Sequence, residues 1–185
     1  MAERDDEDSK SYDYLSFVDS AFERYCLESF DVNGDGRLSR YEAESVREIA
    51  CPNRGIGLLD NIDAFTRLER LDCSGNELQR LAVDENLQLQ ELRCAGNRLE
   101  ELVLGRLRGL TLLDCSENSL PSLDVSYTQS LVALDCRSNR LQTLDVSPCS
   151  PLLKADVRSN PDLATVYYRA GQPLNFDGQT TPVEL

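Results

Sequence analysis

The chain has 185 residues, with 19 basic and 33 acidic side chains and a formal net charge of −14. Nucleic acid and anionic membrane surfaces are therefore unfavourable partners, because binding to phosphate groups requires a basic face. The chain contains no histidine, which removes the commonest general base and the usual ligand of catalytic zinc. No catalytic fingerprint occurs, so the sequence does not predict an enzyme. No stretch approaches the roughly 18 apolar residues of a membrane span.

Residues 1–12 are strongly acidic and are predicted to form a flexible tail. The opening lacks the basic start and the apolar segment of a signal peptide. Two interpretations follow: a cytoplasmic protein, or a mature chain whose signal has been replaced by Met1. In the second interpretation, the tail would tether the folded body to a membrane anchor.

Residues 13–49 are predicted to form a helical cap built around a calcium-binding loop at residues 31–42. The loop matches the twelve-residue EF-hand motif, in which oxygen ligands alternate along the chain and Gly36 permits the sharp turn at position six. Apolar residues at helical spacing precede the loop and predict a helix before it. A second set at helical spacing follows the loop and predicts a helix that continues through Ile49. The expected calcium ligands are Asp31, Asn33, Asp35, the backbone carbonyl of Arg37, Ser39 through a water molecule, and Glu42.

Three other interpretations of the loop remain open. A vestigial EF-hand would keep the shape without the ion, although no ligand is missing here. A dockerin-type module would need a second copy of the loop, and a calcium sensor resembling calmodulin usually pairs two. The chain has one complete loop, which favours a structural calcium site.

Residues 50–168 contain a sequence repeat. In its four regular copies, equivalent positions recur every 21 residues, as at Leu71, Leu92, Leu113 and Leu134. The shared pattern is Leu-x-x-Leu-x-Cys-x-x-Asn-x-Leu, which is the leucine-rich-repeat pattern. A leucine and a cysteine two residues apart point to one side of a short strand, so both are expected in the core. The asparagine is expected to bond backbone groups of its own and the neighbouring coil. The four regular copies contain Leu71, Cys73 and Asn76; Leu92, Cys94 and Asn97; Leu113, Cys115 and Asn118; and Leu134, Cys136 and Asn139.

A second apolar pair in each copy predicts a second buried wall, and no coil can bury both walls alone. These pairs are Leu81 and Val83, Leu102 and Leu104, Leu123 and Val125, and Leu144 and Val146. A degenerate first coil is indicated by three residues that match the first regular copy at a spacing of 22, namely Ile49, Cys51 and Ile56. Residues 169–185 are predicted to close the stack with one or two edge strands. The predicted fold is an α/β repeat solenoid of about five to six coils of 21–22 residues, with a helical EF-hand-like cap and a short β C-terminal cap.

The seven cysteines are predicted to be free. One cysteine per coil, with parallel side chains about 4.8 Å apart along the stack, leaves the Cβ atoms too far apart for a disulfide. A linear row also cannot converge on zinc. We therefore expect these cysteines to act as small buried hydrophobic groups. Cys149 is predicted to lie on the outer return of its coil and to be the most reactive thiol.

Outward-facing strand positions are expected to form aligned rows on the predicted sheet. One row is mostly aspartate and is interrupted by Arg93, and Leu112 contributes to an apolar patch near the middle. A mixed patch of this kind suits a protein or peptide partner. The alternative is a solvated face whose charges only keep the protein soluble. The candidate partner-binding residues are Arg70, Asp72, Arg93, Leu112, Asp114, Asp135, Arg137, Asp156 and Arg158.

A helix–loop–helix cap leading directly into leucine-rich repeats resembles the arrangement of the internalins. The repeat motif Leu-Asp-Cys-Ser-x-Asn is similar to that of secreted repeat proteins of the Bacteroidetes. The resemblance covers roughly residues 13–168 and implies an extracytoplasmic interaction protein, at the cell surface, in the periplasm or secreted, with a lipid anchor as one form of attachment in the precursor. Internalin caps generally lack a complete calcium shell, and this chain departs from them in having one.

The sequence supports three function hypotheses. The first is an extracytoplasmic module that binds a protein or peptide through the strand face and carries a structural calcium ion. The second is a calcium-responsive switch protein, and a non-binding structural spacer is a related alternative. The third is an enzyme with an unrecognised site, which no motif favours.

Overall fold

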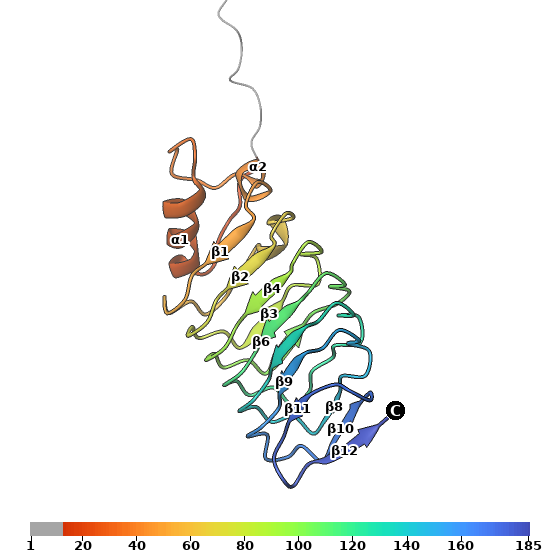
Figure 1. The fold of residues 1–185 in the computed structure, drawn as a ribbon. Helices are drawn as coiled ribbons and strands as arrows, with labels where there is room; N and C mark the ends of the chain where they lie inside the picture. Colours follow the sequence, from red (N-terminus) through yellow and green to blue (C-terminus); the bar gives the residue numbers. More distant parts are fainter. Residues whose placement is uncertain (1–12) are drawn as a thin grey trace, which may run out of the picture.

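The computed structural model describes residues 13–185, so the predicted tail at residues 1–12 lies outside the described part of the chain. Figure 1 shows a helical cap at one end of an elongated stack of coils, with the C-terminus at the other end. The architecture is a β-solenoid of about six coils. Within residues 13–185, no helix has the length and apolar composition that crossing a bilayer requires.

One wall of the solenoid is a continuous parallel sheet, here called the strand sheet. Neighbouring strands pair residues that are equivalent in successive repeats, as Leu71 with Leu92. In the first pairing, Ile49 and Leu71 are one residue farther apart along the chain than the later partners are. The predicted degenerate first coil is therefore a true member of the stack. In spatial order the strands are β1 (Glu48–Ala50), β2 (Arg70–Asp72), β4 (Glu91–Arg93), β6 (Leu112–Asp114), β7 (Ala133–Asp135), β9 (Lys154–Asp156) and β11 (Leu174–Asn175).

The opposite wall, here called the second wall, consists of two separate parallel sheets. One pairs β3 (Arg80–Ala82) with β5 (Glu101–Val103), and the other joins β8 (Thr143–Asp145), β10 (Thr165–Tyr168) and β12 (Thr181–Glu184). Between them, residues 122–124 form no strand. At the C-terminal end, β11 extends the strand sheet and β12 extends the second wall. The closing segment therefore supplies an edge strand to each wall.

The core lies between the two walls. The inward leucines and cysteines of the strand sheet are at most 1% exposed from Leu71 to Cys136. On the second wall, Leu81, Leu123 and Leu144 are also buried, whereas Leu102 is only partly buried. Burial of a leucine side chain stabilises a fold by about 1.5–3 kcal/mol, so the stack gains most of its stability from contacts between coils.

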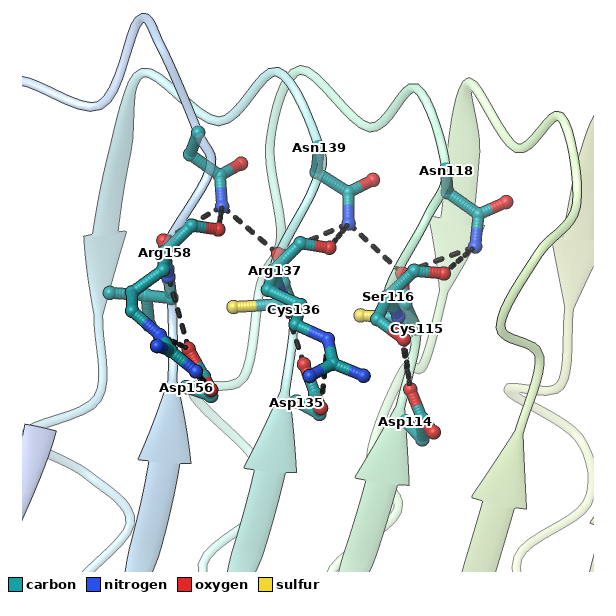
Figure 2. Close-up of polar contacts among 12 residues, drawn as sticks. Asp114, Cys115, Ser116, Asn118, Asp135, Cys136, Arg137, Asn139, Asp156 and Arg158 are labelled. Carbon is teal, nitrogen blue, oxygen red and sulfur yellow. Dashed lines mark hydrogen bonds and ion pairs between the residues drawn. The ribbon is translucent and has the colours of Figure 1, made fainter. Parts of the chain in front are cut away.

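The asparagines form the predicted ladder along the turn that follows each strand (Figure 2). The Asn139 amide donates to the carbonyl oxygens of Cys115 in the preceding coil, at 3.0 Å, and of Cys136 in its own coil, at 3.1 Å. Its Oδ1 accepts the N–H of Leu120 at 3.0 Å. Equivalent bonds are made by Asn97, Asn118 and Asn160. The ladder satisfies backbone groups that would otherwise be buried without partners.

The turn before each asparagine requires a left-handed residue. The sequence supplies glycine there in the early coils, as at Gly75 and Gly96, with φ of 67° and 63°. Later coils place Glu117, Ser138 and Ser159 in the same conformation, with φ between 54° and 58°. A side chain in this conformation costs roughly 1–2 kcal/mol, so the later turns are held by their neighbours at the expense of local strain.

Helix α1 (Ser20–Phe30) closes the N-terminal end of the stack. Its buried face contains Phe22, which packs with Phe65 at a ring separation of 6.4 Å. The Tyr25 hydroxyl accepts the N–H of Ala50 on the edge strand β1 at 2.9 Å. The Asp19 carboxylate caps the first turn of α1 and also accepts two N–H groups of the first coil, from Gly57 and Leu58. The cap thus occupies a sheet edge that would otherwise be exposed.

The predicted second helix of the cap is shorter than expected. Helix α2 spans only Arg40–Ala43, and a 3-10 turn follows much later at Ile62–Ala64. The expected helical continuation through Ile49 is wrong, because Ile49 lies in β1, fully buried and paired with Leu71. A strand at this position buries the side chain and completes the backbone bonds of β2, whereas a helix would leave the edge of β2 open.

Candidate functional site

The acidic loop lies between α1 and α2, and its alternating side chains fold back onto the loop backbone. The Asp31 carboxylate accepts the N–H groups of Gly34 at 2.8 Å and Gly36 at 2.9 Å. The Asn33 side chain accepts the N–H of Asp35, and Asp35 accepts the N–H of Arg37, both at 2.9 Å. Both glycines are left-handed, with φ of 70° and 77°, which a non-glycine residue rarely adopts.

Glu42 connects the two ends of the loop. Its Oε1 accepts the N–H groups of Val32 and Asn33 at 3.0 and 3.3 Å, and its Oε2 accepts the N–H and the hydroxyl of Ser39 at 2.9 and 2.7 Å. Ser39 is also the N-cap of α2, so the pair forms a capping box. Burial alone would raise the pKa of the Glu42 carboxyl, but the hydrogen bonds that it accepts outweigh burial and lower that pKa.

A segment before α1 supplies the loop with a strand partner that sequence analysis missed. Residues 13–15 run antiparallel to residues 38–40, with Tyr14 bridged to Ser39 and the N–H of Leu15 donated to the Leu38 carbonyl at 2.8 Å. The Tyr14 hydroxyl donates to the Asp35 carboxylate at 2.9 Å, which contributes most to lowering the pKa of Asp35. The loop therefore pairs with the chain's own N-terminal side. No local pattern in the sequence indicates this contact.

The donor set of the loop suits calcium, because every expected ligand offers oxygen. Asp31, Asp35 and Glu42 hold their carboxylates toward the loop backbone, in the order along the chain that the motif requires. These oxygens accept hydrogen bonds from the loop, and among residues 13–185 no group of three or more carboxylates, thiols or imidazoles lies close enough to hold a metal ion. Calcium binding would therefore draw the Glu42 carboxylate away from part of its capping box. The six predicted ligands, including Arg37 and Ser39, remain a prediction.

The strand sheet brings the predicted partner-binding residues into rows. The central row pairs Asp72 with Arg93, Arg93 with Asp114, and so on through Asp135 to Asp156. Figure 2 shows the last three carboxylates side by side at the ends of their strands. Arg70 and Leu112 occupy the row two residues earlier, and Arg137 and Arg158 follow two residues later. All nine predicted residues thus belong to one face.

The aspartates of this row also have a structural role. Four of them accept the N–H of the residue two positions later, at 3.0 to 3.3 Å, and so terminate the strand with an Asx turn. Arg93 stands at the equivalent position in its coil and forms an ion pair with Glu91 at 2.8 Å instead. The row is therefore both a surface feature and part of the turn geometry. The four are Asp72, Asp114, Asp135 and Asp156.

Most charges on the strand face are paired within it. Arg158 holds Asp156 through two hydrogen bonds at 2.6 and 2.9 Å, which lowers the pKa of that carboxyl. Arg137 lies 3.5 Å from Asp135. The pKa of Asp135 is nevertheless raised, first by burial and also by the neighbouring carboxylates in its row. Asp156 is buried, with 5% exposure, so the surface estimate of at most about 1 kcal/mol applies to the Arg137–Asp135 pair alone.

A shallow hollow of about 150 Å³ lies at the centre of the face. Its floor is apolar, from Leu112 and Ala133, and its rim carries charges of both signs, including Arg93, Asp135 and Lys154. Leu153, which directly precedes Lys154 in the chain, is 75% exposed. An apolar centre with a charged rim is the composition expected of a protein-binding surface.

All seven cysteines are free and buried. Burial raises the pKa of the ladder thiols, and the row extends upstream to Cys51, where burial raises the thiol pKa to about 12. Cys149 lies on the return between β8 and β9, as predicted, but its burial does not support the predicted reactivity. Its side chain is 0% exposed, its thiol lies 3.8 Å from the Thr128 hydroxyl, and burial raises its pKa. The turn that contains Cys149 folds inward, because position 149 belongs to the same buried column as Thr128 and Leu107.

Comparison with known proteins supports the fold. The chain is similar to the functional domain of InlJ from Listeria monocytogenes, which includes a cysteine ladder, with 29% identity and a TM-score of 0.64 over 80% of this chain. The match covers 33% of that domain, so this chain spans about a third of its length. Internalin C2 from Listeria monocytogenes str. 4b F2365 matches with 16% identity and a TM-score of 0.53, over 90% of this chain and 92% of that one, and shows the fold alone.

No protein-family model and no curated protein matches the chain. Its structural neighbours are thus internalins, and the chain is an internalin-like leucine-rich-repeat solenoid. The comparisons lend no support to the predicted likeness to Bacteroidetes proteins.

Proposed function

We propose that the chain is an extracytoplasmic module that binds a protein or peptide through the strand face, with a structural calcium ion in its N-terminal cap. The observation that carries the binding role is the hollow over Leu112 and Ala133, which lies within aligned rows of charge on a sheet of seven strands. Rows repeated at strand spacing allow several coils to act together on one extended partner. The likeness to internalins supports an interaction protein located outside the cytoplasm. A lipid anchor on a longer precursor is compatible with that location.

Lys154 offers the sharpest test of the binding role. It lines the hollow and forms no ion pair within the described residues, so its replacement disturbs little else. A photo-crosslinking amino acid at position 154 is expected to capture one predominant partner from extracellular extracts. The matched control is the same crosslinking amino acid at position 108. This position is occupied by an exposed arginine on the segment that connects β5 to β6. Lys154→Glu should then weaken binding of the purified partner by about tenfold, as loss of a central contact does.

A comparable capture at position 108, or unchanged affinity of Lys154→Glu, would contradict the strand-face assignment. Arg93→Ala and Arg137→Glu extend the test along the rows. Both side chains are largely exposed, so neither change should alter the free energy of unfolding by much. A partner whose affinity responds to none of these three changes must bind elsewhere.

The calcium site is tested by thermal unfolding with chelator and with millimolar calcium. A lone loop is expected to bind near the 10⁻⁴–10⁻³ M range of extracellular modules. Calcium at a hundredfold excess over its dissociation constant would then stabilise the fold by about 2.7 kcal/mol. Glu42→Gln should remove most of this stabilisation, because it removes one of the carboxylates around the ion. An equal calcium response in Glu42→Gln and the parent would exclude the loop as the binding site.

A further inference from the structure

The charged groups of the strand face differ in whether the protein itself neutralises them. Arg137 and Arg158 each form an ion pair with the aspartate two residues earlier in the chain (Figure 2). Ser116 occupies the equivalent position in the coil of Asp114, and its hydroxyl donates to that carboxylate at 2.7 Å. A hydroxyl satisfies a hydrogen-bond acceptor but carries no charge. Asp114 therefore keeps a negative charge that forms no ion pair among residues 13–185.

Lys154 is the opposite case on the same face. It belongs to the row that runs from Glu91 through Leu112 and Ala133, and it is exposed. Glu91 forms an ion pair with Arg93 of its own strand at 2.8 Å. Lys154 forms no ion pair with any described residue, so its positive charge is also left for solvent or for a partner.

These two charges lie diagonally across the central hollow, and both line it. Asp114 is on β6 and Lys154 is on β9, with β7 alone between them. Two strand spacings and an offset of two residues along the strands place their Cα atoms about 12 Å apart. The diagonal passes over the row position of Ala133 and beside Asp135, whose carboxylate is already paired with Arg137. The hollow therefore has one acidic end, one basic end and a small apolar side chain between them.

We propose that the partner is an extended segment of mixed charge, with a basic side chain on Asp114, an acidic side chain on Lys154 and an apolar side chain over Ala133. This inference rests on the proposed function, because it names the chemistry of the segment that occupies the same hollow. In an extended segment, residues four apart lie about 13 Å from each other and point to one side, as does the residue midway between them. The pattern basic-x-apolar-x-acidic therefore matches the diagonal. A segment with the same charge at both ends would set one end against a like charge, which disfavours it.

The test uses three pentapeptides, blocked at both termini, that differ only in their end charges: Lys-Ser-Val-Ser-Glu, Lys-Ser-Val-Ser-Lys and Glu-Ser-Val-Ser-Glu. Binding is measured by NMR titration at physiological ionic strength, from the backbone amide shifts of Leu112 and Ala133. We expect the mixed peptide to bind about fivefold more tightly than either of the others, which is the ratio that one exposed ion pair can supply. The protein has a net charge of −14, so long-range attraction alone would favour the lysine–lysine peptide instead.

Variants at the two charges should change this order in different ways. Lys154→Glu should bind the lysine–lysine peptide most tightly, because both ends of the hollow are then acidic. Asp114→Asn keeps an oxygen that can accept the N–H and hydroxyl of Ser116, and it should bind the mixed and the glutamate–glutamate peptides equally. Arg108→Glu is the matched control, since it changes the net charge as much as Lys154→Glu but lies outside the hollow. It should keep the order of the parent.

The possible failures are distinguishable. Equal affinities of the three peptides for the parent, with shifts at Leu112 and Ala133, would overturn the charge pattern and leave the strand face as a binding surface. An order that Lys154→Glu does not change would overturn the place assigned to the acidic side chain. Absence of shifts with every peptide at millimolar concentration would overturn the proposed occupant, and crosslinking at position 154 would still test the binding role by itself.

Discussion

The two walls of the solenoid share one repeat period but differ in continuity. The strand sheet runs unbroken through seven strands, whereas the second wall divides into sheets of two and three strands. Inward leucines occur on both walls, so hydrophobic burial does not explain the difference. Beside the strand sheet, each asparagine adds side-chain bonds between coils, as Asn139 does with Cys115 and Leu120. On the second wall, Pro121 has no N–H to donate to the coil before it, and residues 122–124 form no strand.

The largest expected effect comes from removing a ladder asparagine. Asn139→Ala deletes bonds to the carbonyls of Cys115 and Cys136 and to the N–H of Leu120. The two carbonyls keep bonds from Asn118 and Asn160, whereas the buried N–H of Leu120 is left without a partner. We expect a loss of about 3 kcal/mol or more in the free energy of unfolding. Thr128→Val, beside the second wall, removes the bond to the Val125 carbonyl at 2.9 Å and should cost about 1 kcal/mol. Urea denaturation measures both, and comparable losses would refute the asymmetry between the walls.

Replacing a buried cysteine by serine should also cost more stability beside the strand sheet than beside the second wall, but this difference should be smaller than that between Asn139→Ala and Thr128→Val. The Cys94 thiol forms no hydrogen bond within the described residues, so Cys94→Ser buries an unpaired hydroxyl at a cost of roughly 1–3 kcal/mol. The Cys149 thiol already lies 3.8 Å from both the Thr128 hydroxyl and the Val125 carbonyl. Cys149→Ser should therefore be the milder change in the same urea assay. In the folded protein neither cysteine should react with a thiol reagent, and rapid labelling of either one would contradict its burial.

The smallest expected effect concerns the left-handed turns beside the strand sheet. Ser138→Gly removes strain at a φ of 56°, partly offset by the greater chain entropy of glycine, and should stabilise the fold by roughly 0.5–1 kcal/mol. Gly96→Ser is the reciprocal change at the equivalent position, where an added Cβ would meet only ordinary contacts at 3.7 Å. It should destabilise by a similar amount. Melting temperatures that move in the same direction for both variants would show that strain at this turn does not limit stability.

The repeat could be predicted from sequence because its causes are local and recur. Leucine and cysteine two residues apart, followed by asparagine, determine the strand, its inward face and the turn, and the structure confirms the strands and the asparagine ladder. Ile49 was ambiguous, since it fits both a helical stripe and the first repeat, and only its pairing with Leu71 decides between them. Cys149 was predicted to be reactive from its place on an outer return, and spacing alone did not show that its side chain is buried there.

The candidate sites show a similar division. The residues of the acidic loop and of the strand face are read directly from spacing, and the structure places each set on one loop and one face. The pairing of Tyr14 with Ser39 depends on a contact between segments on either side of α1, which no local pattern encodes. Pro121 occupies the repeat position of Glu100, so the sequence shows that its coil lacks one N–H, whereas the absence of pairing between residues 122–124 and β8 has no signal in the sequence.

The asparagine ladder has a consequence for how the length of such a chain can change. Each rung reaches back by one coil only, as Asn118 reaches Cys94 and Asn139 reaches Cys115. A tandem duplication of one whole repeat within the regular copies would insert a coil whose asparagine finds the same carbonyls one step earlier, and the cap and the closing strands would keep their own neighbours. The number of coils is therefore not encoded by any contact in the regular part of the stack. Duplication or loss of whole repeats can lengthen or shorten the strand face without redesign of either end.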